Sequence, residues 1–269
     1  MNEVNVLSLG AGVQSTTMLL MACHGEILPK PDLVVFADTG WEPKPVYRHL
    51  EWLRKESAKH GLFVTIATGG NIRDDMINSV NDSKRFASLP FFTRNQDGSI
   101  GMVRRQCTNE YKIQVVRKAT REFLGYKPGQ RVKEKVSMWK GISTDEIERV
   151  ADSHDKWITN RYPLIERYMS RLDCLNWMTR KGYPTPPKSS CIGCPFHDDR
   201  MWLDMKRNDP ESWEDAVYID KVIKGLPRFK GEAYLHRSCK PLDEVNLNEN
   251  QMDMFDDQFL NECSGHCGV

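Results

Sequence analysis

The chain lacks any long hydrophobic run. Its longest apolar stretches, such as residues 33–37, are far shorter than the ~20 residues that cross a bilayer. Residues 1–30 show no basic segment followed by an apolar core, the pattern of a secretory signal. Charged residues make up 28% of the 269 residues. We therefore expect a soluble protein of the cytoplasm with no membrane partner.

A disulfide framework is also not expected, although the chain contains eight cysteines. A cytoplasmic chain stays reduced, and one of this length buries a large core without crosslinks. Cys23 and Cys174 lie in apolar helical patterns, so we expect both to be small core residues. The grouping of the other cysteines suggests metal or redox chemistry.

Lysine and arginine are absent from residues 241–269, which carry seven acidic residues. Residues 94–135 have the opposite bias, with eleven basic and four acidic residues and a net charge of +7. This basic block favours contact with a nucleic acid or another polyanion. The alternative is a solvated helix face.

Apolar strand patterns alternate with helical patterns along the chain. Strands are expected at residues 4–9, 32–37, 63–67 and 136–142, and helices at 14–24, 43–60, 109–124, 166–182 and 209–224. This alternation predicts an α/β fold with a doubly wound, mostly parallel, Rossmann-like sheet whose ligand lies at the carboxyl ends of the strands.

The expected domain organisation has three parts. Residues 1–165 form a nucleotide-binding α/β domain, in which the aperiodic residues 79–106 are a lid or long loop. Residues 166–242 form a helical, cysteine-containing extension, and residues 243–269 form an acidic tail.

The first loop, Ser-Leu-Gly-Ala-Gly-Val-Gln-Ser at residues 8–15, joins an apolar strand to a helix. It has no lysine, which excludes a Walker A loop. A dinucleotide fingerprint needs a small glycine or alanine where Ser15 stands, so that interpretation is weak. A tight turn without a ligand is a further alternative. Small residues before a helix N-terminus favour bound phosphate.

This loop resembles the pyrophosphate-binding loop (PP-loop) of the adenine nucleotide alpha-hydrolase superfamily, with Gln14 where that family has Asp. Three later segments resemble those of phosphoadenylyl sulfate (PAPS) reductases: Asp-Thr-Gly-Trp-Glu at 38–42, Gly-Ile-Ser-Thr-Asp-Glu-Ile-Glu-Arg at 141–149 and Tyr-Pro-Leu-Ile at 162–165. The chain is therefore similar to PP-loop ATPases of the PAPS reductase-like branch.

The resemblance implies a set of site residues. ATP would be bound by Ser8, Gly10, Ala11, Gly12, Gln14, Ser15, Asp38, Thr39, Gly40 and Gly141. The implied catalytic residues are Asp38, Asp145, Glu146 and Arg149. Their carboxylates would hold Mg²⁺ or order the loop, and the arginine would bind the phosphates. Alternatively, residues 145–149 are simply a helix N-terminus with an i,i+4 ion pair.

Cys191 and Cys194 form a Cys-x2-Cys knuckle, and Cys107 is a candidate third ligand. Together they resemble the three-cysteine pattern of tRNA 2-thiocytidine synthetases, which bind a [4Fe–4S] cluster. Cys239 would be a fourth ligand, as in DNA phosphorothioation PP-loop proteins and bacterial adenylyl sulfate reductases. Structural zinc and metal-free thiols are the alternatives.

The resulting functional hypothesis is an ATP pyrophosphatase that adenylates a substrate, expected to be nucleic acid, for sulfur transfer. Its partners would be an adenine nucleotide, tRNA or DNA held through residues 94–135, a sulfur-donor protein and a second copy of the chain. One alternative is a sulfonucleotide reductase, with Cys263 as the nucleophile and Cys267 resolving it. Another is a non-enzymatic nucleotide- or nucleic-acid-binding module with a structural zinc knuckle.

Overall fold

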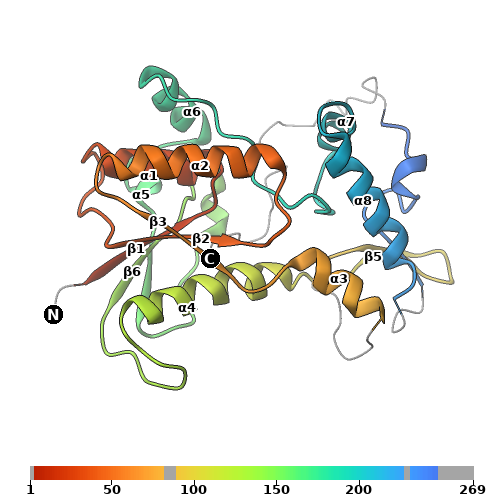
Figure 1. Cartoon of the computed structure of the whole chain (residues 1–269), viewed down its shortest axis with the longest axis horizontal. Helices are drawn as coiled ribbons and strands as arrows, with labels where there is room; N and C mark the ends of the chain where they lie inside the picture. Colours follow the sequence, from red (N-terminus) through yellow and green to blue (C-terminus); the bar gives the residue numbers. More distant parts are fainter. Residues whose placement is uncertain (1–2, 82–88, 227–230, 248–269) are drawn as a thin grey trace.

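The computed structural model describes residues 3–81, 89–226 and 231–247. Its central sheet has five strands: β1 (Val4–Leu9), β2 (Leu33–Asp38), β3 (Val64–Thr68), β6 (Val136–Trp139) and β7 (Ile158–Arg161). Their order is β3-β2-β1-β6-β7, and every neighbouring pair is parallel. The predicted α/β fold with a doubly wound, mostly parallel sheet is therefore confirmed (Figure 1).

The inner strands are nearly continuous apolar runs, because both faces of the sheet are covered. β1 and β6 pair from Val4 with Val136 to Leu7 with Trp139, and all four residues of β6 are buried. On the other side of β1, Val6 faces Leu33 of β2. β1 thus lies in the middle of the sheet, and its carboxyl end opens on the first loop.

One face of the sheet is covered by α1 (Val13–Cys23) and α2 (Lys44–Ala58), with α5 (Pro163–Glu166) and α6 (Arg171–Arg180) beside them; α4 (Gln114–Phe123) covers the other face (Figure 1). Every residue of α1 is buried. Its pattern has little amphipathic character because α2 and α6 enclose the side turned away from the sheet. α6 thus belongs to the first hydrophobic core, although it follows residue 165.

The helix expected at residues 166–182 is interrupted. α5 ends at Glu166 and α6 begins after Ser170, whose side chain accepts a hydrogen bond from the Asp173 N–H. Between them Tyr168 has a left-handed φ of 55° and is 88% exposed. Ser170 and Asp173 form a capping box, which starts a new helix at a position that hydrophobic spacing alone does not reveal.

A second core lies beside the main sheet. It contains α3 (Ile72–Asn81), α7 (Asp199–Asn208), α8 (Pro210–Ile223), η3 (Leu242–Glu244) and an antiparallel sheet of β5 (Ile100–Met102), β4 (Phe92–Arg94) and β8 (Glu232–Tyr234). The expected lid at residues 79–106 therefore includes two short strands. They are too short to show a period, and β4 pairs with β8 far along the chain.

Two further turns complete the framework: η1 (Asn109–Ile113), a π-helical turn before α4, and η2 (Thr144–Arg149), a 3₁₀ segment. Trp41 joins the second core to the end of β2, since its Nε1–H donates to Asp215 of α8 over 2.6 Å. Arg73 of α3 also binds Asp215, at 2.7 Å. In the part of the chain described here, no helix has the length and apolar character that a membrane span requires.

Candidate functional site

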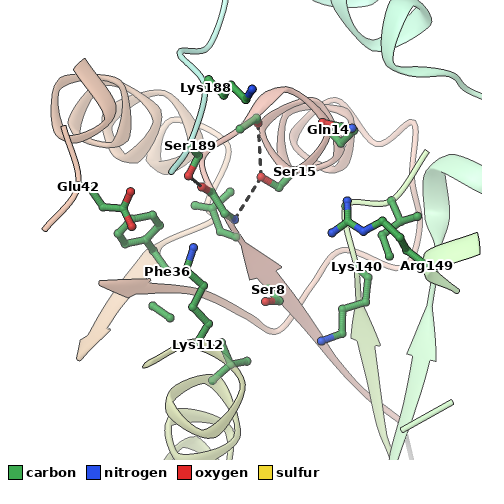
Figure 2. Close-up of a pocket in the computed structure, with 17 residues that line it drawn as sticks. Ser8, Gln14, Ser15, Phe36, Glu42, Lys112, Lys140, Arg149, Lys188 and Ser189 are labelled. Carbon is green, nitrogen blue, oxygen red and sulfur yellow. Dashed lines mark hydrogen bonds between the residues drawn. The ribbon is translucent and has the colours of Figure 1, made fainter. Parts of the chain in front are cut away.

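A pocket opens at the carboxyl ends of β1 and β6, where the strand order reverses direction (Figure 2). This switch point is the usual ligand site of open α/β sheets. The pocket is lined by Ser8, Leu9, Gly10, Gly12, Gln14, Ser15, Phe36, Ala37, Glu42, Lys112, Val116, Lys140, Gly141, Ile142, Arg149, Lys188 and Ser189. The first loop thus contributes Ser8, Leu9, Gly10, Gly12, Gln14 and Ser15 to this lining.

The loop turns sharply into α1. Ala11 has a left-handed φ of 57°, and Gly12 is the N-cap residue in an extended conformation. The Gly10 N–H donates to Ser15 Oγ over 3.2 Å, which holds the turn closed. No described side chain caps the N-terminus of α1. The positive end of the helix dipole therefore faces the pocket region and suits an anion.

Gly141, after β6, touches this loop directly. A Cβ atom at position 141 would lie 2.8 Å from the Ser15 nitrogen and 2.9 Å from its Cα. Only glycine permits this approach of one backbone to another. The contact brings the end of β6 against the start of α1 and closes one wall of the pocket.

Four cationic side chains from four separate segments line the pocket: Lys112, Lys140, Arg149 and Lys188 (Figure 2). Glu42 is the carboxylate among the lining residues. Such a surplus of positive charge beside a helix N-terminus favours a polyanion such as a phosphate chain. Of the four, the sequence analysis assigned only Arg149 to the site. A lysine directly after a buried strand, as at Lys140, was the available signal for another.

Gln14 lines the pocket, but its amide is held by neighbours. Its Nε2 donates to Glu146 Oε2 over 3.0 Å, and its Oε1 accepts from Arg171 over 3.1 Å. Glu146 also pairs with Arg149. Asp145 accepts from the Arg171 N–H at 3.1 Å. Asp145 and Glu146 thus brace the loop and the start of α6, and neither lines the pocket.

Asp38 is also turned away from the pocket. Its Oδ1 accepts hydrogen bonds from the Gly40 N–H at 2.8 Å and from the Tyr47 hydroxyl at 2.9 Å. Burial, together with the Asp38 hydrogen bond, raises the pKa of Tyr47. Gly40 has a left-handed φ of 73° against Asn71. Asp38 and Gly40 therefore shape the turn that follows β2.

Glu42, four residues later, does line the pocket. Its Oε1 accepts from Thr39 Oγ1 over 3.1 Å, while its buried Oε2 has no hydrogen-bond partner among the described residues. The Cys191 thiol donates to the same Oε1 over 3.6 Å and lies 3.3 Å from Thr39 Oγ1. Glu42 therefore connects the cation-lined pocket to the cysteines.

Cys107, Cys191 and Cys194 line one small cavity next to this pocket, together with Arg105 and Lys112. The knuckle is tied to the turn after β2, since the Ile192 N–H donates to the Trp41 carbonyl over 2.9 Å. Burial, aided by the Glu42 charge, raises the pKa of the Cys191 thiol. Among residues 3–81, 89–226 and 231–247, no three His, Cys, Asp or Glu side chains are arranged as a metal site.

Cys239 is buried near Arg94 and does not line that cavity. Cys23 and Cys174 are buried in the first core, as predicted. Burial raises their pKa values to about 11 and about 12, so both remain thiols. Cys263 and Cys267 lie outside the described residues.

The structure divides the basic block into two parts. Lys112 and Arg105 lie at the pocket and the cysteine cavity, and Arg104 is exposed in the same loop. By contrast, residues 127–135 lead into the first residue of β6, at the end of the strand away from the pocket. Arg117, on α4 between them, pairs with Asp155 at 2.6 Å.

The fold and the pocket together define a doubly wound α/β protein with a cation-rich pocket at the switch point of its sheet. No protein-family model matches the chain. No curated protein matches it either. Among solved structures, it is similar to the U34-tRNA thiolase NcsA from Methanococcus maripaludis with its [4Fe–4S] cluster. The similarity spans 100% of this chain and 82% of that chain, at 12% identity and a TM-score of 0.41. A likeness at this level does not by itself assign a function.

Proposed function

We propose that this chain is an ATP-binding enzyme of the PP-loop type that adenylates a substrate for sulfur transfer. The observation that carries the proposal is the cation-lined pocket between the N-terminus of α1 and the end of β6. Uncapped helix N–H groups and four cationic side chains complement a triphosphate better than they complement a neutral or cationic ligand.

In the proposed reaction, an oxygen of the substrate attacks the α-phosphorus of ATP, and pyrophosphate leaves. The pocket cations stabilise the charge that gathers on the leaving phosphates. Sulfide, delivered at that oxidation level by a donor protein, then attacks the carbon that bears the adenylated oxygen; the C–S bond forms as the C–O bond breaks, and AMP leaves. Adenylation is needed because the unactivated oxygen of the substrate is a poor leaving group.

For Mg²⁺, the residue that supports binding best is Glu42, because its buried Oε2 lacks a partner and it lines the pocket. A carboxylate oxygen is a ligand that Mg²⁺ prefers. Asp38, Asp145 and Glu146 were the expected ligands, but in the structure they contact the Tyr47 hydroxyl, main-chain N–H groups, Gln14 and Arg149. We therefore propose that these three order the surrounding loops.

For an iron–sulfur cluster, the thiols of Cys107, Cys191 and Cys194 are donors of the right chemistry and line one cavity beside two cations, although among the described residues no three such side chains are arranged as a metal site. We propose these three as its ligands, with Cys239 as the ligand that the structure supports least. When bound, such a cluster with one open iron can hold sulfide. Lys112 and Arg105 would balance the charge of the thiolates.

The expected substrate is tRNA or DNA. A nucleic acid that reaches the pocket would meet Arg104, Arg105 and Lys112, and not the basic residues 127–135. Contacts with phosphates make binding salt-dependent. We therefore expect Arg104→Ala to weaken nucleic-acid binding, while Lys133→Ala, at the far end of β6, leaves it unchanged.

The test uses the full chain purified without oxygen and reconstituted with iron and sulfide. We expect saturable MgATP binding, pyrophosphate release when tRNA or DNA is added, and absorbance near 400 nm. Lys188→Met should weaken MgATP binding, and Lys133→Met is the matched control. Failure to bind ATP, or to release pyrophosphate with any nucleic acid, refutes the proposal. Colourless protein with stoichiometric zinc would instead favour the zinc-knuckle alternative.

A further inference from the structure

Lys140 is the most deeply buried of the four cationic residues that line the pocket. It follows Trp139, the last residue of β6, and its N–H donates to the Arg161 carbonyl over 2.9 Å. Because β6 lies between β1 and β7, Lys140 follows an inner strand of the sheet. It is only 6% exposed, and its side chain lines the pocket (Figure 2).

No carboxylate within the described residues forms a hydrogen bond or an ion pair with Lys140. The pocket carboxylate, Glu42, accepts hydrogen bonds from Thr39 and Cys191 instead. The remaining charged groups that line the pocket, Lys112, Arg149 and Lys188, are all cations.

The charged groups on the neighbouring elements are occupied as well. On η2, Glu146 pairs with Arg149. On β7, Arg161 pairs with Glu166 at 2.8 Å and lies over the ring of Trp139. A charged Lys140 ammonium would therefore lose hydration without gaining a counter-ion. Burial lowers the pKa of Lys140 to about 7.

We propose that Lys140 is a phosphate-binding residue that is uncharged in the empty pocket and takes up one proton from solvent when the phosphates of a nucleotide enter. This inference rests on the proposed ATP binding. The proton is added to Nζ, and no bond to the ligand is formed. The resulting ammonium has three N–H donors and a full charge next to the phosphate oxygens.

Proton uptake makes nucleotide affinity depend on pH in one direction. Below about pH 7 the ammonium already exists, so binding needs no proton from solvent. Above that pH, each unit of pH weakens binding by up to about tenfold while the bound form remains protonated. An arginine at position 140 would be charged at every pH and would remove this dependence.

The experiment is calorimetric titration of MgATP into the full chain in buffers that differ in ionisation enthalpy, which counts the protons taken up. At pH 8 we expect the unmodified protein to take up close to one proton more than Lys140→Met or Lys140→Arg. At pH 6 this difference should shrink towards zero. Lys140→Arg should bind MgATP at least as tightly as the unmodified protein at pH 8, whereas Lys140→Met should bind about tenfold more weakly.

The exposed Lys127 supplies the matched control, because Lys127→Met removes a lysine charge far from the pocket. Its proton uptake should equal that of the unmodified protein. Equal uptake by the unmodified protein and Lys140→Arg at pH 8, with both binding MgATP, overturns the inference. This comparison stands even if Lys140→Met does not fold. Absence of MgATP binding by the unmodified protein refutes the proposed function instead.

Discussion

The cation-lined pocket and the cysteine cavity are neighbours, but they are built differently. The pocket lies where a strand end, a helix N-terminus and the Gly141 contact meet, and four cationic side chains line it. The cysteine cavity lies beside the second core and is lined by Thr39, Ile72 and residues within 89–112 and 189–196. Lys112 and Ser189 line both cavities, and a hydrogen bond from Thr39 to Glu42 joins the two. We therefore expect that a substitution can disrupt the cation-lined pocket and leave the cysteine cavity intact, or the reverse.

The largest effect is expected at Gly193, between the two knuckle cysteines. A Cβ atom there would overlap the Trp41 ring, so Gly193→Ala must displace the knuckle or the indole. We expect metal content after reconstitution to fall at least about tenfold, with a stability loss of about 2–3 kcal/mol. Metal analysis and chemical denaturation measure both effects.

The control for this substitution is Gly182→Ala, which has a left-handed φ of 73° and no atom within 4 Å of the added Cβ. It should retain metal. If Gly193→Ala lowers MgATP affinity as much as metal content, the two sites are one cooperative unit and the comparison fails.

The converse substitution is Gly141→Ala. Its Cβ would meet the Ser15 backbone at 2.8 Å, so the loop must move away from β6. We expect MgATP binding to weaken by about tenfold to a hundredfold, or roughly 1.4–2.8 kcal/mol. Metal content should stay unchanged. Titration calorimetry and metal analysis on one preparation test this, with Gly25→Ala, in an open turn, as the control.

The buried Lys140 should make the free energy of unfolding depend on pH. Burial lowers its pKa from 10.5 to about 7, so between pH 7 and 10 the unfolded chain binds a proton that the folded chain does not. The free energy of unfolding should therefore rise with pH across this window, by up to about 1.4 kcal/mol per pH unit. In Lys140→Met this contribution should vanish. Denaturation curves at pH 7, 8 and 9, recorded for both proteins without nucleotide, give the free energy of unfolding at each pH. The same pH dependence of this free energy in both proteins would contradict the prediction.

The smallest effect is expected at Cys174 in the first core. Cys174→Ala removes a buried sulfur that lines neither the pocket nor the cysteine cavity, which should cost about 1 kcal/mol of stability. Metal content and MgATP affinity should not change. Cys191→Ala is the contrasting variant and should lose metal. Loss of metal in Cys174→Ala would show that the first core also supports the cysteine cavity.

Much of the fold could be predicted because its signals are local. The strand at 4–9 was predicted with the observed bounds, and the helix at 14–24 is displaced by one residue. Buried parallel strands and their helices are marked by continuous apolar runs and helical spacing. The roles of Cys23 and Cys174 followed from the same patterns and are confirmed. Strands β4 and β5 were missed, since three residues carry no period.

The candidate site was only partly predictable. The loop at residues 8–15 and Gly141 were found because they carry the motifs. Glu42 and Lys140 were missed, and Asp38 was placed in the pocket although its carboxylate binds Tyr47. Adjacent residues at a strand end point in different directions. The sequence offers no means to choose among them without the packing around the turn.

The sequence by itself determined that the sheet is mostly parallel, where four of its five strands lie, and that a glycine-rich turn starts α1, because strand burial, helical periodicity and small-residue turns are properties of neighbouring residues. Only the tertiary structure decided which charges meet. Lys112, Lys140, Arg149 and Lys188 come from four segments, and three cysteines come together around one cavity. Electrostatic and thiol sites depend on distances through space, and those distances exist only once the two cores have packed.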